Sequence, residues 1–247
     1  MAKQTFKIWR GEGETGEFVE YTTEITEGMV VLDAIHQIQA ESASDLAVRW
    51  NCKAGKCGSC SAEINGMPKL MCMTRMNTLP PGETVTVEPM RTFPLIKDLA
   101  TNVKFNYDAK KKIKRFAPRK ADNADGTLSM QQADIDRVQE YRKCIECFLC
   151  QDVCHVLRDH HKHEEFVGPR YFVHTAALEM HPADTADRLK DLKDDHGLGY
   201  CNITKCCTKV CPEGIVITDN AIIPLKERVV DRYYDPVAKI LGLFKTN

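Results

Sequence analysis

The sequence has no long apolar run, no marked excess of charge of one sign and no leader-like N-terminus. No stretch reaches the roughly 18 apolar residues that a membrane-spanning helix needs, so we expect no transmembrane span. The formal net charge of −1 gives no electrostatic reason to expect a nucleic acid or an acidic membrane surface as a direct partner. Residues 1–6 have neither the apolar core of a signal peptide nor an Arg- and Ser-rich transit segment, so the chain is expected to stay in the cytosol.

What the sequence does contain is cysteine, with 12 in 247 residues. Thiols stay reduced in the cytosol, so this number indicates metal ligands and not disulfides. The cysteines fall into three groups, which are Cys52, Cys57, Cys60 and Cys72, then Cys144, Cys147, Cys150 and Cys154, then Cys201, Cys206, Cys207 and Cys211.

A long polar stretch separates the first cysteine group from the second, and we place a domain boundary in residues 105–125. The resulting division is a domain over residues 1–110 and a second domain over residues 111–247. Alternating apolar residues predict strands in the first domain, whereas helical spacing dominates the second, so the fold class is α+β. The predicted strands are 6–9, 18–22 and 84–87, and the predicted helices are 30–41, 131–143, 170–180 and 221–233.

The first cysteine group has the spacing C-x4-C-x2-C-x11-C. Gly55 and Gly58 stand between its first three cysteines, where the backbone must wrap closely around a ligand. Asn65-Gly66 is a strong signal for a type I′ hairpin, which brings Cys60 opposite Met71 and therefore close to Cys72. Four thiolates can then converge on one site.

The opening C-x4-C-x2-C of this group is the spacing of plant-type 2Fe–2S ligands. A structural zinc site is the alternative, but zinc sites usually use paired C-x2-4-C knuckles. We therefore predict a 2Fe–2S cluster bound by Cys52, Cys57, Cys60 and Cys72.

The second group lies at offsets 0, 3, 6 and 10, which is the bacterial ferredoxin run. The same offsets from Cys201 reach cysteine at every position except Thr204. In two-cluster ferredoxins the fourth cysteine of each run binds the other cluster. This exchange predicts a 4Fe–4S cluster on Cys144, Cys147, Cys150 and Cys211, and a 3Fe–4S cluster on Cys154, Cys201 and Cys207.

Cys206 falls outside the offset pattern. We interpret it as a small buried side chain and not as a ligand, since buried cysteines often act as small hydrophobes. His155, His160, His161 and His163 follow the second run closely. They are either a proton path or quinone contact beside the three-iron site, or, as we favour, a solvated helix face or partner surface.

This set of three sites resembles the iron–sulfur subunits of succinate dehydrogenase and fumarate reductase. The resemblance covers nearly the whole chain, and its most specific matches are residues 49–60, 72–75 and 207–212. It implies a β-grasp ferredoxin domain at residues 1–110 and a helical ferredoxin domain at residues 111–247.

The resemblance also implies partners: a flavoprotein with FAD that oxidises succinate, and membrane anchor subunits that bind quinone. The chain would then lie on the cytoplasmic face of a bacterial plasma membrane, held there by those subunits. Electrons leave succinate as a pair and must travel singly, so a series of one-electron centres is needed. No catalytic acid, base or nucleophile is expected on this chain, because the succinate chemistry belongs to the flavoprotein.

Three alternatives are kept. The same relay could run in reverse in a fumarate reductase. The chain could serve another flavin-dependent oxidoreductase, but such subunits usually carry two complete C-x2-C-x2-C-x3-C-P runs and lack the first site. A structural zinc protein without redox function would bind about three zinc atoms and be colourless.

Overall fold

A computed structural model of the chain describes residues 2–237. These residues form two compact units that alternate along the sequence. The first unit contains residues 2–104, 145–153 and 210–212, and the second contains residues 105–144, 154–209 and 213–237. The predicted domain ranges, 1–110 and 111–247, remain a prediction.

The first unit is built on a mixed sheet of seven strands. Its longest strands, β1 and β2, form an antiparallel hairpin, and β5 pairs in parallel with β1. The path through the sheet is β4-β3-β5-β1-β6-β7, with β2 paired to β1. The strands are β1 Ala2–Glu12, β2 Thr15–Ile25, β3 Ser61–Ile64, β4 Met67–Leu70, β5 Val85–Glu88, β6 Leu95–Lys97 and β7 Ala100–Thr101.

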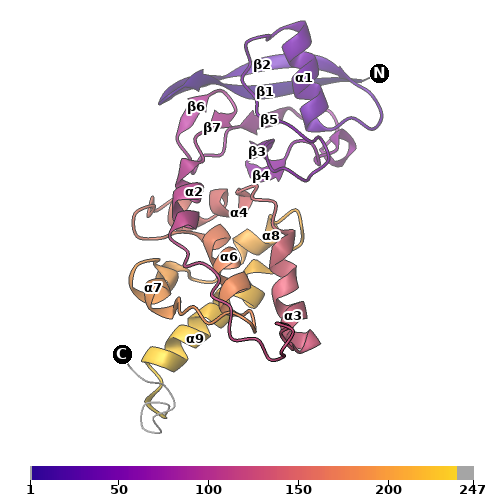
Figure 1. The fold of residues 1–247 in the computed structure, drawn as a ribbon. Helices are drawn as coiled ribbons and strands as arrows, with labels where there is room; N and C mark the ends of the chain where they lie inside the picture. Colours follow the sequence, from indigo (N-terminus) through magenta and orange to yellow (C-terminus); the bar gives the residue numbers. More distant parts are fainter. Residues whose placement is uncertain (1, 238–247) are drawn as a thin grey trace. The chain divides into compact units, whose positions relative to one another are not determined.

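One helix, α1 (Val31–Glu41), packs against this sheet (Figure 1). Its Leu32, Ile35 and Ile38 recur at helical spacing and are at most 1% exposed. They meet Phe6 and Ile8 from alternate positions of β1, which are fully buried. Burial of each such side chain contributes roughly 1.5–3 kcal/mol, and this core holds the cysteine loops of the unit.

The β3–β4 hairpin is the one that the sequence predicts. Asn65 and Gly66 both have positive φ, at 50° and 72°, as a type I′ turn requires. The amide of Met71 donates to the carbonyl of Cys60 at 3.1 Å, so the predicted pairing of these two residues is confirmed.

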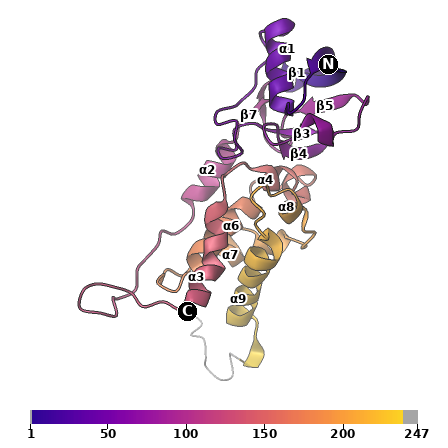
Figure 2. The same ribbon diagram turned by 90° about the vertical axis from the view of Figure 1, so that its right-hand side faces the viewer.

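The second unit is helical. In this unit α6 packs against α3 (Figure 2). Helix α6 also packs against the π-helical turn η4, which leads directly into α9. Its core includes Phe166, Phe172 and Leu192, each at most 1% exposed. In the chain as a whole, the first unit also contains the short turn η1 Met76–Thr78 and α4 Leu149–Asp152. The other helical elements after α1 are α2 Lys104–Lys111, α3 Gln132–Gln139, η2 Glu140–Lys143, α5 His155–Arg158, α6 Pro169–Glu179, α7 Leu189–Asp194, η3 Leu198–Tyr200, α8 Cys206–Lys209, η4 Ile217–Ile222 and α9 Ile223–Tyr233.

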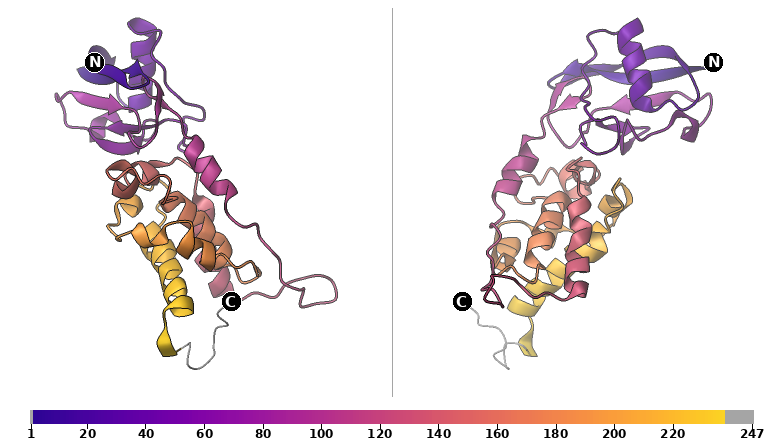
Figure 3. Two further views of the ribbon diagram at one scale, coloured as in Figure 1. Left: turned by 90° about the vertical axis from the view of Figure 1, so that its left-hand side faces the viewer. Right: turned by 45° about the vertical axis from the view of Figure 1, so that its right-hand side comes forward.

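The connection from α2 to α3 is long and irregular, and a tight turn projects from it (Figure 3). The amide of Asp122 donates to the carbonyl of Thr127 at 3.1 Å, closing the turn. Arg119 binds the Asp122 carboxylate and donates to the carbonyl of Ser129 at 2.8 Å. These contacts give the polar linker a defined local structure.

The fold class α+β is confirmed, and each predicted strand and helix has a counterpart. The helix predicted over 131–143 is α3 followed by the 3-10 turn η2, and the helix over 221–233 is the end of η4 followed by α9. Strands β6 and β7 were not predicted. Within residues 2–237, no helix is both long and apolar enough to cross a bilayer.

Candidate iron–sulfur sites

Cys52, Cys57 and Cys60 lie in a loop that leads into β3 of the first unit, and Cys72 follows β4. Backbone amides point at its sulfurs: Ala54 and Lys56 each donate to Cys52 Sγ at 3.3 Å. The amide of Cys72 lies 3.5 Å from Cys60 Sγ, across the hairpin. Backbone donors of this kind stabilise thiolate charge, which a cluster ligand carries.

Two thiols of this group, those of Cys57 and Cys60, have shifted pKa values. Burial raises the pKa of Cys60 to about 12, and the neighbouring thiols of Cys72 and Cys57 add to that rise. Burial acts in the same direction on Cys57, but hydrogen bonds from Ser59 and Cys52 outweigh it and lower the pKa of Cys57 to about 6. Cys60 therefore lies near Cys72 and Cys57, and Cys57 lies near Cys52; that the four bind one cluster stays a prediction.

The loop touches the segment that carries the second cysteine run. Gly58 has φ of +68°, and a Cβ there would lie 2.6 Å from Cys147 Cα. The hydroxyl of Ser61 reaches the carbonyls of both Gly58, at 2.9 Å, and Cys147, at 2.8 Å. All these residues belong to the first unit, so two predicted ligand loops are in direct contact there.

The second run is anchored in the core of the first unit. Cys147 and Leu149 belong to that core, and Ile145 and Val210 pack against it. Asp152 accepts a hydrogen bond from the amide of Thr92 at 3.1 Å, and its carbonyl accepts one from the Thr92 hydroxyl at 3.0 Å. Of the four predicted 4Fe–4S ligands, Cys147, Cys150 and Cys211 lie in the first unit, and Cys144 follows η2 in the second.

The third set, Cys154, Cys201 and Cys207, lies entirely in the second unit. Burial raises the pKa of Cys154 to about 12, an effect opposed by backbone amides of α5 and reinforced by the thiols of Cys206 and Cys207. Burial likewise raises the pKa of Cys207 to about 11, opposed by a hydrogen bond from Thr218 and reinforced by Cys206 and Cys201. Cys207 therefore lies near both Cys154 and Cys201, and their binding of one cluster stays a prediction.

Cys206 belongs to the same group of thiols. It is half-buried and not fully buried, so this part of the prediction is wrong. Its Sγ lies 3.3 Å from the hydroxyl of Thr204, the residue at the vacant ligand offset. That Cys206 is not a ligand stays a prediction.

Backbone strain concentrates in the cysteine loops. Among the described residues, eight other than glycine have positive φ, and five of these lie within two residues of a predicted ligand, namely Lys53, Glu146, Phe148, Ile203 and Lys205. Each such conformation costs of order 1–3 kcal/mol and persists only where surrounding structure imposes it. Composition and spacing did not reveal this feature, because none of the five is a residue type that favours positive φ.

These donor sets fit iron–sulfur clusters chemically. Thiolates are the ligands that such clusters use, and amide or hydroxyl donors aimed at the sulfurs are typical of them. Within residues 2–237, no three His, Cys, Asp or Glu side chains are arranged to hold a single metal ion.

The histidines near the second run do not form one group. The rings of His155 and His160 lie 6.0 Å apart, whereas His163 packs edge-on against Phe105 at 5.0 Å. These contacts give no support to a shared metal or proton site.

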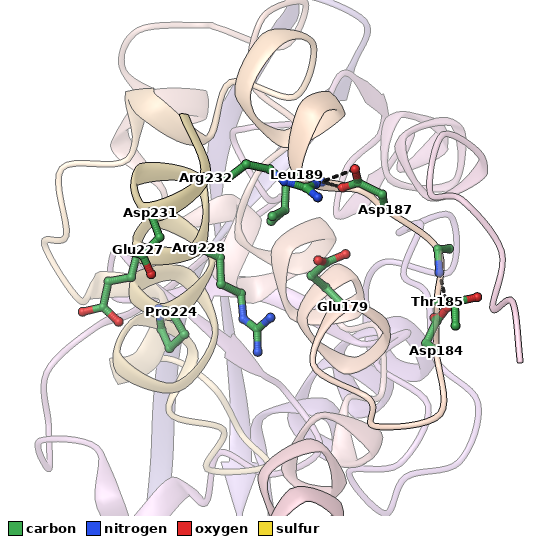
Figure 4. A pocket seen from close by; sticks show the side chains of 11 residues that line it. Glu179, Asp184, Thr185, Asp187, Leu189, Pro224, Glu227, Arg228, Asp231 and Arg232 are labelled. Atoms are coloured by element: carbon green, nitrogen blue, oxygen red, sulfur yellow. Dashed lines mark hydrogen bonds and ion pairs between the residues drawn. The ribbon is translucent and has the colours of Figure 1, made fainter. Parts of the chain in front are cut away.

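A pocket of about 610 Å³ lies between α9 and the segment after α6 (Figure 4). Carboxylates and guanidinium groups line it, including an ion pair of 2.5 Å between Arg232 and Asp187. Glu179 faces it, and burial raises the pKa of that carboxyl. The pocket contains no cysteine, so it adds nothing to the candidate sites.

Comparison with known proteins agrees with the first two cluster types. Residues 5–107 match a family model described as a 2Fe-2S iron-sulfur cluster binding domain. Residues 140–215 match one described as a 4Fe-4S dicluster domain.

Individual relatives carry the comparison further. The fumarate reductase iron-sulfur subunit of Mycobacterium tuberculosis is 31% identical over 202 residues, which cover 80% of each chain. An uncharacterized iron-sulfur protein of Methanococcus maripaludis is 29% identical over 86% of this chain, which spans only 42% of that protein's length. A chain of the Mycobacterium smegmatis Sdh1 complex in the apo form is 60% identical and superposes with a TM-score of 0.91, covering 95% of this chain and 98% of that one. The chain belongs to the family of succinate dehydrogenase and fumarate reductase iron–sulfur subunits.

Proposed function

We propose that the chain is the electron-transfer subunit of a succinate dehydrogenase. It would relay single electrons from the FAD of a flavoprotein subunit to membrane quinone through 2Fe–2S, 4Fe–4S and 3Fe–4S clusters. When bound, the clusters supply one-electron redox chemistry that amino-acid side chains lack. The chain's own residues supply thiolate ligands and hydrogen bonds to sulfur.

One observation carries this proposal: the loops of the first two sites touch. Ser61 Oγ lies 2.8 Å from the carbonyl oxygen of Cys147, and Gly58 leaves no room for a side chain between the two loops. Electron tunnelling falls off steeply with distance, so a relay needs neighbouring ligand loops. A zinc protein that used the three sites independently would gain nothing from this contact.

Chain connectivity supports closeness of the second and third sites. Cys150 and Cys154, assigned to different clusters, are four residues apart, as are Cys207 and Cys211. Four residues span at most about 14 Å even when fully extended. The exchange of ligands between the two runs would therefore hold both clusters close together.

The chemistry of succinate itself is assigned to the partner. The assigned role of every predicted site residue is that of a cluster ligand, so the chain would act as a subunit without a catalytic site. Quinone-binding anchor subunits would hold it at the cytoplasmic face of a bacterial plasma membrane.

The direction of electron flow is proposed from the comparisons. The 60% identity with a chain of an Sdh1 complex favours succinate oxidation. A fumarate reductase is the second candidate, because the M. tuberculosis relative bears that name.

The test uses the complete complex, purified without air. Addition of succinate is expected to reduce the clusters, as followed by EPR. Cys207→Ser should abolish the three-iron signal and slow quinone reduction, whereas the adjacent Cys206→Ser should leave the signal intact. No reduction by succinate would contradict the proposed function, and loss of the signal in Cys206→Ser alone would contradict the ligand assignment.

A further inference from the structure

A buried threonine lies against a predicted ligand of the three-iron site. Thr218 is 1% exposed, and its Oγ1 lies 3.4 Å from Cys207 Sγ, within the second unit. Thr218 stands in the π-helical turn η4, a conformation that is rare and is often found at functional sites.

A second threonine fixes the orientation of that hydroxyl. Thr208 donates its hydroxyl proton to Thr218 Oγ1 at 3.1 Å. The same Thr208 oxygen accepts the backbone amide of Thr218 at 3.0 Å, which satisfies an N–H of the first turn of η4. Because Thr208 already donates to one lone pair of Thr218 Oγ1, the proton of Thr218 can point at the sulfur.

The direction of the hydrogen bond between Thr218 Oγ1 and Cys207 Sγ follows from the protonation state of the sulfur. A thiolate bound to iron carries no proton, so only Thr218 can be the donor in the pair with Cys207.

We propose that Thr218, oriented by Thr208, raises the reduction potential of the three-iron cluster through this hydrogen bond. Reduction adds negative charge to the cluster and its sulfurs, so a donor at Cys207 stabilises the reduced form more than the oxidised form. The inference rests on the proposed function, because it takes Cys207 as a cluster ligand. Thr218 is thus a positioning residue that sets how readily the last centre accepts an electron.

The test is an EPR-monitored redox titration of the three-iron signal in the purified complex. Thr218→Val removes the hydroxyl while keeping the shape of the side chain. We expect the reduction equilibrium to shift about tenfold towards the oxidised form, equal to a fall of about 59 mV for a one-electron couple. Thr218→Ser restores a donor and should keep the wild-type midpoint.

Two further variants make the result specific. Thr208→Val should lower the midpoint in the same direction, because it leaves the Thr218 hydroxyl unoriented. Thr175→Val is the matched control: it changes an equally buried threonine, 1% exposed in α6, and should leave the midpoint unchanged. If the three-iron cluster does not assemble in Thr218→Val, the midpoint potential of the cluster in Thr208→Val tests the inference instead.

The outcomes separate this inference from the proposed function. An intact three-iron signal with an unchanged midpoint in Thr218→Val and Thr208→Val overturns the inference alone. A wild-type complex without a three-iron signal overturns the ligand assignment and the inference with it. A lowered midpoint in both valine variants, with a wild-type midpoint in Thr218→Ser, supports the inference.

Discussion

Replacement of Gly58 by alanine tests the contact between the first two ligand loops. Gly58 has φ of +68°, a region that residues with a Cβ adopt at a cost of about 1 kcal/mol or more. The added Cβ would also lie 2.6 Å from Cys147 Cα and 2.9 Å from its amide nitrogen. Real Cβ atoms do not approach backbone so closely, so one loop must move.

The hairpin glycine provides a matched control. Gly66 has a similar φ of +72°, but a Cβ there meets no atom within 4 Å. Gly66→Ala therefore carries only the conformational cost, about 1 kcal/mol. Gly58→Ala carries that cost plus displacement of packed backbone, and we expect a total of about 3 kcal/mol or more.

Urea unfolding of the reconstituted protein measures both values, and EPR measures the 2Fe–2S and 4Fe–4S signals. Gly58→Ala is expected to lose stability and to weaken both signals, because Ser61 can no longer bridge Gly58 and Cys147. Equal destabilisation by the two substitutions, with both signals unchanged, would refute the reasoning.

Three other variants give independent tests. Arg91 donates three hydrogen bonds to the fully buried carboxylate of Glu63. Arg91→Met should therefore lower the free energy of unfolding, measured by urea titration, by about 2–3 kcal/mol. A loss below about 0.5 kcal/mol would contradict this role. Burial lowers the pKa of His196 below 6.5, although nearby carboxylates oppose this effect. Because the unfolded chain then binds more protons than the folded chain, the free energy of unfolding should fall as the pH drops below about 6.5. His196→Gln should flatten that dependence, and an equal slope in both proteins would count against the assignment. Thr204→Cys fills the vacant ligand offset and should convert the three-iron cluster towards 4Fe–4S; an unchanged EPR signal would show that the offset alignment is wrong.

The elements that sequence predicts well are those whose determinants are local. Asn65-Gly66 specifies its own turn, and the turn then fixes which residues of β3 and β4 are paired. Helix α1 follows from the spacing of its apolar residues, which matches the face it buries. Cysteine spacing likewise predicts the 2Fe–2S and 4Fe–4S types that the family models match, because few spacings suit a cluster.

What could not be predicted depends on contacts between distant residues. Residues 145–153 follow the linker in sequence yet pack with the first unit, through contacts such as Ser61 with Cys147, 86 residues apart. Periodicity within a segment carries no information on such a contact. The hydrogen bond of Thr218 to Cys207 was missed for a related reason: threonine is common, and only the π-helical turn brings this one to a sulfur.

The ligand assignment is tested most directly by the iron and acid-labile sulfide content of the complex purified without air, measured together with its EPR spectrum. We expect about nine iron atoms on this chain, with a three-iron signal in the oxidised state. About ten iron atoms without that signal would mean two complete four-iron clusters. That result would contradict the prediction that the cluster lacks a ligand at the offset occupied by Thr204. Zinc in place of iron would contradict the electron-transfer function altogether.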